Sequence, residues 1–140
     1  MKCFIFLLFF VISLCSFGQS SVDLTVRVVN LENNKGLVQL GLYNTVSRFP
    51  EVGETFKMVR LKTKGNQTVY TFKDLPKGSY ALAIYHDENA NKICDTNFFG
   101  IPKEAYAFSN NFRPRFSVPS FECCDFSLFQ DKLIEIKMIY

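Results

Sequence analysis

The sequence predicts an all-β sandwich of about seven short strands, within a range of six to eight. Three observations predict it. Apolar and polar side chains alternate along most of the chain, turn residues separate the alternating segments at close spacing, and no segment combines a helical period with capping residues. A period of two places alternate side chains on one face of a strand, so each segment is expected to bury one side.

The alternating segments follow one another from residue 22 to the end of the chain, with turns expected at 33–36, 64–66 and 74–78. The residues that share a face in each segment are, in chain order, Val22, Leu24, Val26 and Val28; Val38, Leu40 and Leu42; Val59 and Leu61; Thr68, Tyr70 and Phe72; Tyr80, Leu82, Ile84 and His86; and Ile134, Ile136, Met138 and Tyr140.

Residues 86–120 break this rhythm, because they contain few alternating pairs and many Asn, Asp, Phe and Pro residues. So long an irregular stretch in a compact domain is usually functional or disordered. Its aromatic content argues against disorder. We therefore expect a long ordered loop region at one end or edge of the sandwich.

The first residues are typical of a secretory signal peptide. Lys2 gives a positive start, Phe4 to Ile12 is an unbroken apolar run, and small residues precede Gln19. The run is shorter than the roughly 20 apolar residues that span a bilayer. We expect cleavage after Gly18, which divides the chain into a signal peptide (1–18) and one sandwich domain (19–140). The alternative is a lipoprotein cut before Cys15, but Leu14 is large for that processing.

The charge and the cysteines predict whether the protein binds nucleic acid and whether it forms a disulfide. The chain carries 16 Lys and Arg against 13 Asp and Glu, and the basic residues are scattered, so we expect no nucleic-acid partner. Export permits disulfides. Cys94, Cys123 and Cys124 remain after cleavage, and we expect any disulfide to join Cys94 to Cys123, with Cys124 buried and reduced. Three free thiols are the alternative.

The string from His86 to Asp95 resembles a calcium-binding loop. Asp87, Asn89, Asn91 and Asp95 have the spacing of loop positions 1, 3, 5 and 9, and Ile93 would offer a backbone carbonyl at position 7. Position 6 is Lys92 instead of Gly, and position 12 is Phe98 instead of Glu. A calcium ion would therefore bind weakly, on the order of 0.1–1 mM. The alternative is a turn shaped by Asx hydrogen bonds without a metal.

Two other features have a functional and a structural interpretation. His86, the only histidine, suggests acid–base chemistry, but Asp87 points to the opposite face of a strand, which favours a histidine that closes the core. The aromatic segment 98–112, with Asn110, Asn111 and Arg113, suits a sugar by stacking and amide hydrogen bonds. Such aromatics also form small cores of their own.

Two sets of residues resemble known families. The turn and strand over 72–80, with Asp74-Leu75-Pro76 and Gly78, resemble transthyretin-like (prealbumin-like) bacterial sandwich modules. The strings at 86–89, 95–97, 99–104 and 108–111 are similar to the bacterial family known as domain of unknown function 2141. The resemblance covers nearly the whole mature chain. It implies a small exported sandwich of the immunoglobulin/transthyretin type and no particular reaction.

These features favour an exported binding or accessory module, periplasmic or secreted, for an unknown ligand or envelope protein. No transmembrane span is expected in the mature chain. Whether it is an enzyme stays open. A transthyretin-like hydrolase is one alternative, although its site would need more histidines. A small outer-membrane barrel is another, although barrel strands of about 9–11 residues exceed most segments here.

Overall fold

The computed structural model describes residues 20–115 and 117–140. The signal peptide expected at 1–18 lies outside these residues. The described part contains eight strands: β1 (Val22–Val29), β2 (Leu37–Tyr43), β3 (Lys57–Leu61), β4 (Gln67–Leu75), β5 (Gly78–Asp87), β6 (Tyr106–Phe108), β7 (Phe126–Leu128) and β8 (Lys132–Lys137). Its helical segments are short: the 3-10 turns η1 (Val46–Arg48) and η2 (Ser109–Asn111), and α1 (Phe121–Cys124).

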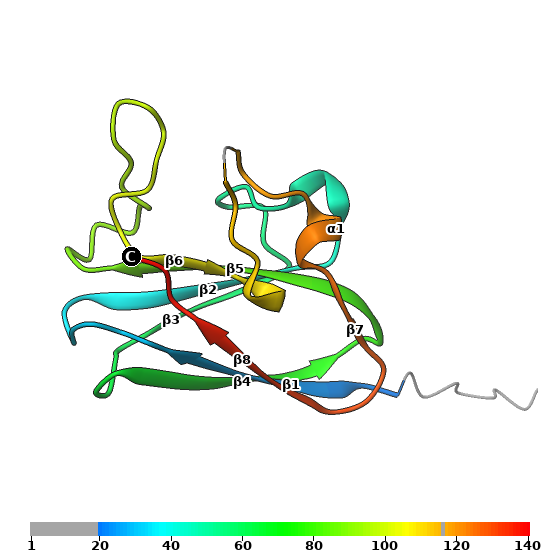
Figure 1. Cartoon of the computed structure of the whole chain (residues 1–140). Helices are drawn as coiled ribbons and strands as arrows, with labels where there is room; N and C mark the ends of the chain where they lie inside the picture. Colours follow the sequence, from blue (N-terminus) through cyan, green and yellow to red (C-terminus); the bar gives the residue numbers. More distant parts are fainter. Residues whose placement is uncertain (1–19, 116) are drawn as a thin grey trace, which may run out of the picture.

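The strands form two sheets packed face to face, which confirms the predicted all-β sandwich (Figure 1). One sheet has three strands in the order β4-β1-β8, and β8 runs parallel to β1. The other has five strands, in the order β3-β2-β5-β6, with β7 pairing along β5. A backbone bridge between Tyr106 and Ile139 links β6 to the residues after β8, and so connects the two sheets along one side.

The core lies between the sheets and is built from the alternating side chains. The strand β1 is buried at every second residue, and Leu24, Val26 and Val28 are fully buried. They face Leu40 and Leu82 of the opposite sheet within one apolar cluster. Burial of this stripe stabilises the strand register, because a slip of one residue would move the whole stripe into solvent.

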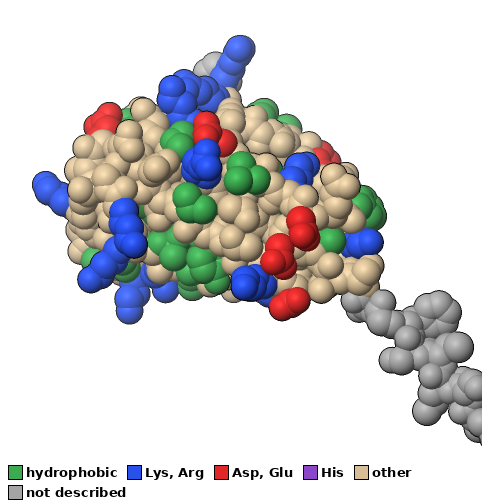
Figure 2. Space-filling model, turned by 90° about the horizontal axis from the view of Figure 1, so that it is seen from below, with side chains coloured by type: hydrophobic (Ala, Val, Ile, Leu, Met, Phe, Trp, Pro, Cys, Tyr) green, Lys and Arg blue, Asp and Glu red, His purple; other side chains and the backbone are tan. Residues whose placement is uncertain are grey.

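The two outer faces of the sandwich differ in character. The outer face of the three-stranded sheet carries charged side chains, including the Arg27–Glu135 ion pair (3.5 Å), together with exposed apolar ones such as Val69 and Leu133, and Figure 2 shows both kinds on it. On the outer face of the five-stranded sheet, Tyr43 and Ala81 are buried under Phe49 and Phe121. This second, smaller core covers only part of that face.

The described residues of segment 86–120, which are 86–115 and 117–120, are ordered, as predicted, but less irregular than expected. They contain β6 and η2, and β6 adds a strand to the five-stranded sheet. Cys124, whose spacing to Phe126 suggests a continuous strand, instead ends the single-turn helix α1. Within the described residues, no helix is long and apolar enough to cross a membrane.

Candidate functional site

A groove of about 790 Å³ lies on the uncovered part of the five-stranded sheet's outer face. Its floor follows the strand register: Gly41 of β2 is paired with Ala83 of β5, and Ala83 with Phe108 of β6. Since Gly41 and Ala83 carry at most a methyl group, the centre of the floor is flat. A Cβ on Gly41 would come within 2.9 Å of Thr55 Cγ2, so residue 41 has little room for a side chain.

The walls of the groove are loops that rise from the same side of the sheet (Figure 1). One wall is the loop between β5 and β6, and the other combines residues 114–115 and 117–119 with Pro50 and Val52. The lining is mostly apolar, and it consists of Gln39, Gly41, Tyr43, Pro50, Val52, Ala83, Ile84, Tyr85, Cys94, Thr96, Phe99, Gly100, Ile101, Pro102, Tyr106, Phe108, Pro114, Arg115, Ser117, Val118 and Pro119.

A small polar group borders the floor. Tyr85 and Gln39 face each other across the β2–β5 register, and the Tyr85 hydroxyl donates to Gln39 Oε1 at 3.1 Å. Burial raises the pKa of Tyr85, an effect that Arg60 partly opposes by hydrogen bonding and charge. The phenol is therefore neutral at physiological pH. An apolar concave surface with a few fixed polar groups is typical of sites for small organic ligands.

Cys94 lines the same groove but is not an activated nucleophile. Burial raises the pKa of its thiol to about 11, and the carboxylates of Glu104, Asp95 and Asp87 act in the same direction. Only the thiolate reacts readily, so this thiol is inert near neutral pH. His86 is fully buried in the sandwich, with Nε2 2.8 Å from the carbonyl oxygen of Lys35. It has no access to solvent.

The loop that begins at Asp87 forms the rim of one wall and holds the predicted calcium ligands. Asp87 is 1% exposed, and its two carboxylate oxygens accept the backbone N–H groups of Asn91 (3.0 Å) and Lys92 (2.8 Å). The amides of Asn89 and Asn91 both donate to Asp95 Oδ2, at 2.7 and 3.0 Å. Ile93 donates its N–H to Asn91 Oδ1. The structure thus brings Asp95, Asn89 and Asn91 together, while Asp87 bonds to the backbone.

Two residues of this loop that are not glycines have positive φ angles. Ala90 and Lys92 have φ angles of 58° and 69°. Such left-handed conformations are uncommon for residues that carry a Cβ. The hydrogen bonds that the N–H groups of Asn91 and Lys92 donate to Asp87 hold the turn in place.

Glu104, which the loop motif does not include, is the residue that joins the two ends of this loop. Its Oε1 accepts the N–H of Glu88 and its Oε2 the N–H of Asp95, at 3.2 and 3.1 Å. Burial raises the pKa of Glu104, and the nearby carboxylates of Asp87 and Asp95 add to the shift. Among the described residues, no three His, Cys, Asp or Glu side chains form a metal-binding group.

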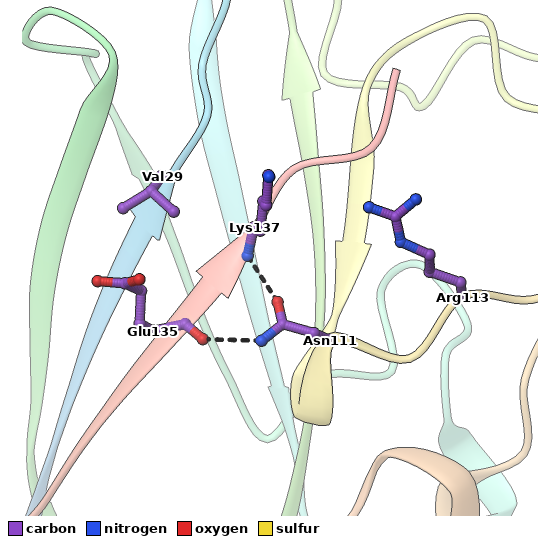
Figure 3. A pocket seen from close by; sticks show the side chains of 5 residues that line it. All are labelled: Val29, Asn111, Arg113, Glu135 and Lys137. Atoms are coloured by element: carbon purple, nitrogen blue, oxygen red, sulfur yellow. Dashed lines mark hydrogen bonds between the residues drawn. The ribbon is translucent and has the colours of Figure 1, made fainter.

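The amide pair suggested for sugar binding has a structural role. Asn111 donates to the carbonyl of Glu135 (3.2 Å) and accepts the N–H of Lys137 (2.7 Å), as Figure 3 shows. It borders a small pocket of about 200 Å³ that Arg113 also lines. Asn110 donates to the carbonyl of Asp125. Both amides are therefore occupied by backbone partners.

The aromatic residues of segment 98–112 divide into three groups. Phe98 and Phe99 are 97% and 83% exposed at the loop tip, with ring centroids 5.6 Å apart. Tyr106 and Phe108 line the groove. Phe112 packs against the second core, so the segment forms partly a core and partly an exposed surface.

The described cysteines are all free thiols. Cys94 is half-buried, Cys123 is exposed and Cys124 is buried. The Cys94–Cys123 disulfide is thus not formed in this structure, and the pairing stays a prediction for oxidised protein. The burial of Cys124 agrees with its expected role as a small apolar side chain.

The fold and the groove define a small β-sandwich domain with an open, mostly apolar concave surface on one sheet. Over residues 26–137 the chain matches the family described as an uncharacterized protein conserved in bacteria (DUF2141), and it belongs to that family. This confirms the resemblance seen in the sequence. The comparisons with curated proteins and with solved structures found no match.

Proposed function

We propose that this domain is a binding module, and that it takes its ligand in the groove on the outer face of the five-stranded sheet. The groove volume of about 790 Å³ carries the proposal. Ligand pockets are commonly about 300–1,000 Å³, with mainly apolar walls and few polar groups. A flat floor between Gly41 and Ala83 leaves this volume open to a ligand.

The proposed site of action is outside the cytoplasm, in the periplasm or the surrounding medium. The support is the signal-like start of the chain, with its apolar run from Phe4 to Ile12. The proposed partner is a ligand or an envelope protein. The hydrolase alternative gains no support from the groove, because His86 is sealed in the core and burial raises the pKa of the Cys94 thiol.

Binding of the neutral dye Nile red, followed by fluorescence, tests the groove. Ala83→Leu would raise a branched side chain from the floor and Ile101→Ser would remove apolar surface from the rim, where Ile101 is 58% exposed. We expect each to weaken dye binding about tenfold, the effect of losing about 1.4 kcal/mol of contact free energy. Val69→Leu, on an exposed position of β4, is the matched control.

Equal dye affinity in all four proteins would contradict the groove as the site. Ala83 is half-buried beside the second core, so its variant requires a check of folding by circular dichroism. Ile101 lies in the loop wall, and its backbone N–H keeps its bond to Asn97 Oδ1 whatever the side chain. If both variants bind the dye more weakly, the loss comes from the changed groove, because Ile101→Ser leaves the sheet and the core unaltered.

We also propose that a calcium ion strengthens the loop that forms one wall. The supporting observations are the convergence of Asn89 and Asn91 on Asp95 and the carboxylate of Asp87 at the base of the turn. Rotation of the two amides would present oxygens to the ion and would release the N–H groups of Asn91 and Ile93 that these oxygens now accept. Calcium binds through several oxygens. The ion would offset the repulsion among Asp87, Asp95 and Glu104, and so stabilise the wall.

A further inference from the structure

The groove contains a single charged side chain. Arg115 is the only charged residue among the described residues that line it. It is exposed, in the wall to which residues 114–115 and 117–119 belong. Among the described residues, the ion pairs of arginine are Arg27–Glu135 and Arg48–Glu54, so Arg115 has no carboxylate partner there.

Arg113 provides a contrast two residues earlier. It lines the separate 200 Å³ pocket, next to Glu135 and Lys137 (Figure 3). Pro114 separates the two arginines along the chain. Arg113 lines the small pocket, whereas Arg115 lines the groove.

The remaining lining extends well beyond the floor as apolar surface. Phe99, Ile101, Val118 and Val52 are between 58% and 83% exposed along the two walls. Contiguous exposed apolar surface of this kind marks binding sites. An occupant that covers these side chains must be apolar over most of its length and can carry one negative charge, at the end that meets Arg115.

We propose that the groove binds a long-chain carboxylate, with the carboxylate on Arg115 and the alkyl chain over Gly41 and Ala83 between the two walls. The planar guanidinium matches a carboxylate through two parallel hydrogen bonds. One guanidinium balances the single charge of a carboxylate, whereas a phosphate dianion would keep an uncompensated charge beside apolar walls. Aliphatic and aromatic groups along both walls suit a chain better than a single ring. This inference rests on the proposed binding function of the groove.

Titration calorimetry with dodecanoate and dodecanol, both below their aggregation concentrations, tests the ligand class. These probes share one alkyl chain and differ at the head. We expect one dodecanoate per protein and about tenfold weaker binding of dodecanol, because charge-assisted hydrogen bonds are the stronger kind. Decanoate should bind more weakly than dodecanoate, by up to about fourfold for each methylene lost.

Arg115→Gln should lower the affinity for dodecanoate to that for dodecanol. Arg113→Gln, the matched control, should leave both unchanged. Equal binding of the acid and the alcohol, or an unchanged dodecanoate affinity in Arg115→Gln, would overturn the proposal. If Nile red binds in the groove but neither amphiphile displaces it, the ligand class is wrong and the binding function stands. If the wild-type protein binds neither Nile red nor dodecanoate nor dodecanol, both the ligand class and the proposed binding function are wrong.

Two further measurements address the other possible occupants of the apolar walls. Co-sedimentation with phosphatidylglycerol vesicles, without binding of free dodecanoate, would show a membrane-docking surface and overturn the proposal. Light scattering could instead show a dimer that Ile101→Ser dissociates. That result would assign the walls to a second copy of this chain and would also overturn the carboxylate proposal. A monomer that binds dodecanoate but not the vesicles is the expected result.

Discussion

Ser109 connects three parts of the fold through one hydroxyl group. It is fully buried, accepts the N–H of Leu82 at 2.8 Å, and donates to the carbonyl of Cys124. These bonds fix η2 against β5 and α1, beside the Asn111 contacts to β8. A serine in this place satisfies two buried backbone groups that lie outside the regular sheet pairing, and buried backbone groups without partners are rare.

Ser109→Ala is therefore expected to destabilise the domain by about 2 kcal/mol, because it leaves a buried N–H and a buried C=O without this partner. The melting temperature should fall by roughly 5–10 °C. Thermal unfolding by circular dichroism measures it. Ser127→Ala changes an exposed hydroxyl on β7 and should leave the melting temperature within about 2 °C of the wild type. A neutral Ser109→Ala would show that water replaces the hydroxyl.

Exposure should make Cys123 the first thiol to react with iodoacetamide, and burial should slow Cys94 and Cys124. Cys123 is exposed and should react first at pH 8. Burial raises the pKa of Cys94 to about 11 and that of Cys124 to about 12, so only about one Cys94 side chain in a thousand is a thiolate at pH 8. The rate at Cys94 should rise about tenfold per pH unit until its pKa is reached.

Peptide mapping by mass spectrometry measures this order and also tests the disulfide. If Cys94 and Cys123 are joined in the oxidised protein, neither will be labelled until a reductant is added. A bridge that includes Cys124 would contradict the prediction, because Cys124 is buried in the second core. Labelling of Cys123 without reductant would establish that it is a free thiol.

At the scale of the elements, alternation of apolar and polar residues predicted the strands of five or more residues, β1 to β5 and β8. The strand β1 has the predicted alternating burial, and His86 is on the core side with Leu82 and Ile84. The strand β6 has only three residues, too few for a period to be visible, and the bond between His86 N and the carbonyl of Ala105 helps to position it. The helix α1 has a single turn, and single turns carry no helical period.

The groove and Glu104 could not be predicted for a different reason. The groove is formed by residues from β2, β5, β6 and three loops that meet only after folding. Glu104 lies sixteen residues from Glu88, its first hydrogen-bond partner, and nine from Asp95. No local spacing rule connects them. The loop motif identified Asp87, Asn89, Asn91 and Asp95 because their contacts are local in sequence.

The loop from Asp87 to Asp95 yields a prediction about metal and stability. With a dissociation constant near 1 mM, 10 mM calcium would add about 1.4 kcal/mol to the free energy of unfolding. The melting temperature should rise by a few degrees relative to protein in chelator. Magnesium should have little effect, because it requires a tighter octahedron of ligands. Differential scanning fluorimetry in the two ions and in chelator provides the comparison.

The double variant Asp87→Asn and Asp95→Asn should lose the calcium increment. Its starting melting temperature should also be lower, because an amide offers one acceptor to the two N–H groups that Asp87 now satisfies. Asp125→Asn, outside the loop, is the control and should keep the increment. An unchanged melting temperature of the wild type between chelator and 10 mM calcium would assign the loop to Asx hydrogen bonds alone.

At the scale of the whole molecule, the two sheets differ in what covers their outer faces. The three-stranded sheet presents an outer face of mixed charged and apolar side chains to solvent (Figure 2). The Arg27–Glu135 ion pair joins β1 and β8 on it. The five-stranded sheet carries the second core, the groove and the exposed tip at Phe98 and Phe99. Loops that form the groove walls therefore rise from one sheet only, and changes in them leave the core between the sheets intact.

The mature protein is expected to begin at Gln19. The apolar run from Phe4 to Ile12 and the small residues before Gln19 predict cleavage after Gly18. A start at Gln19 leaves three residues before β1, which begins at Val22, so the first strand can pair fully with β4 and β8. Intact-mass measurement on protein isolated from the native envelope should give the mass of residues 19–140. A lipid-modified chain that begins at Cys15 would instead place the sandwich on a membrane tether.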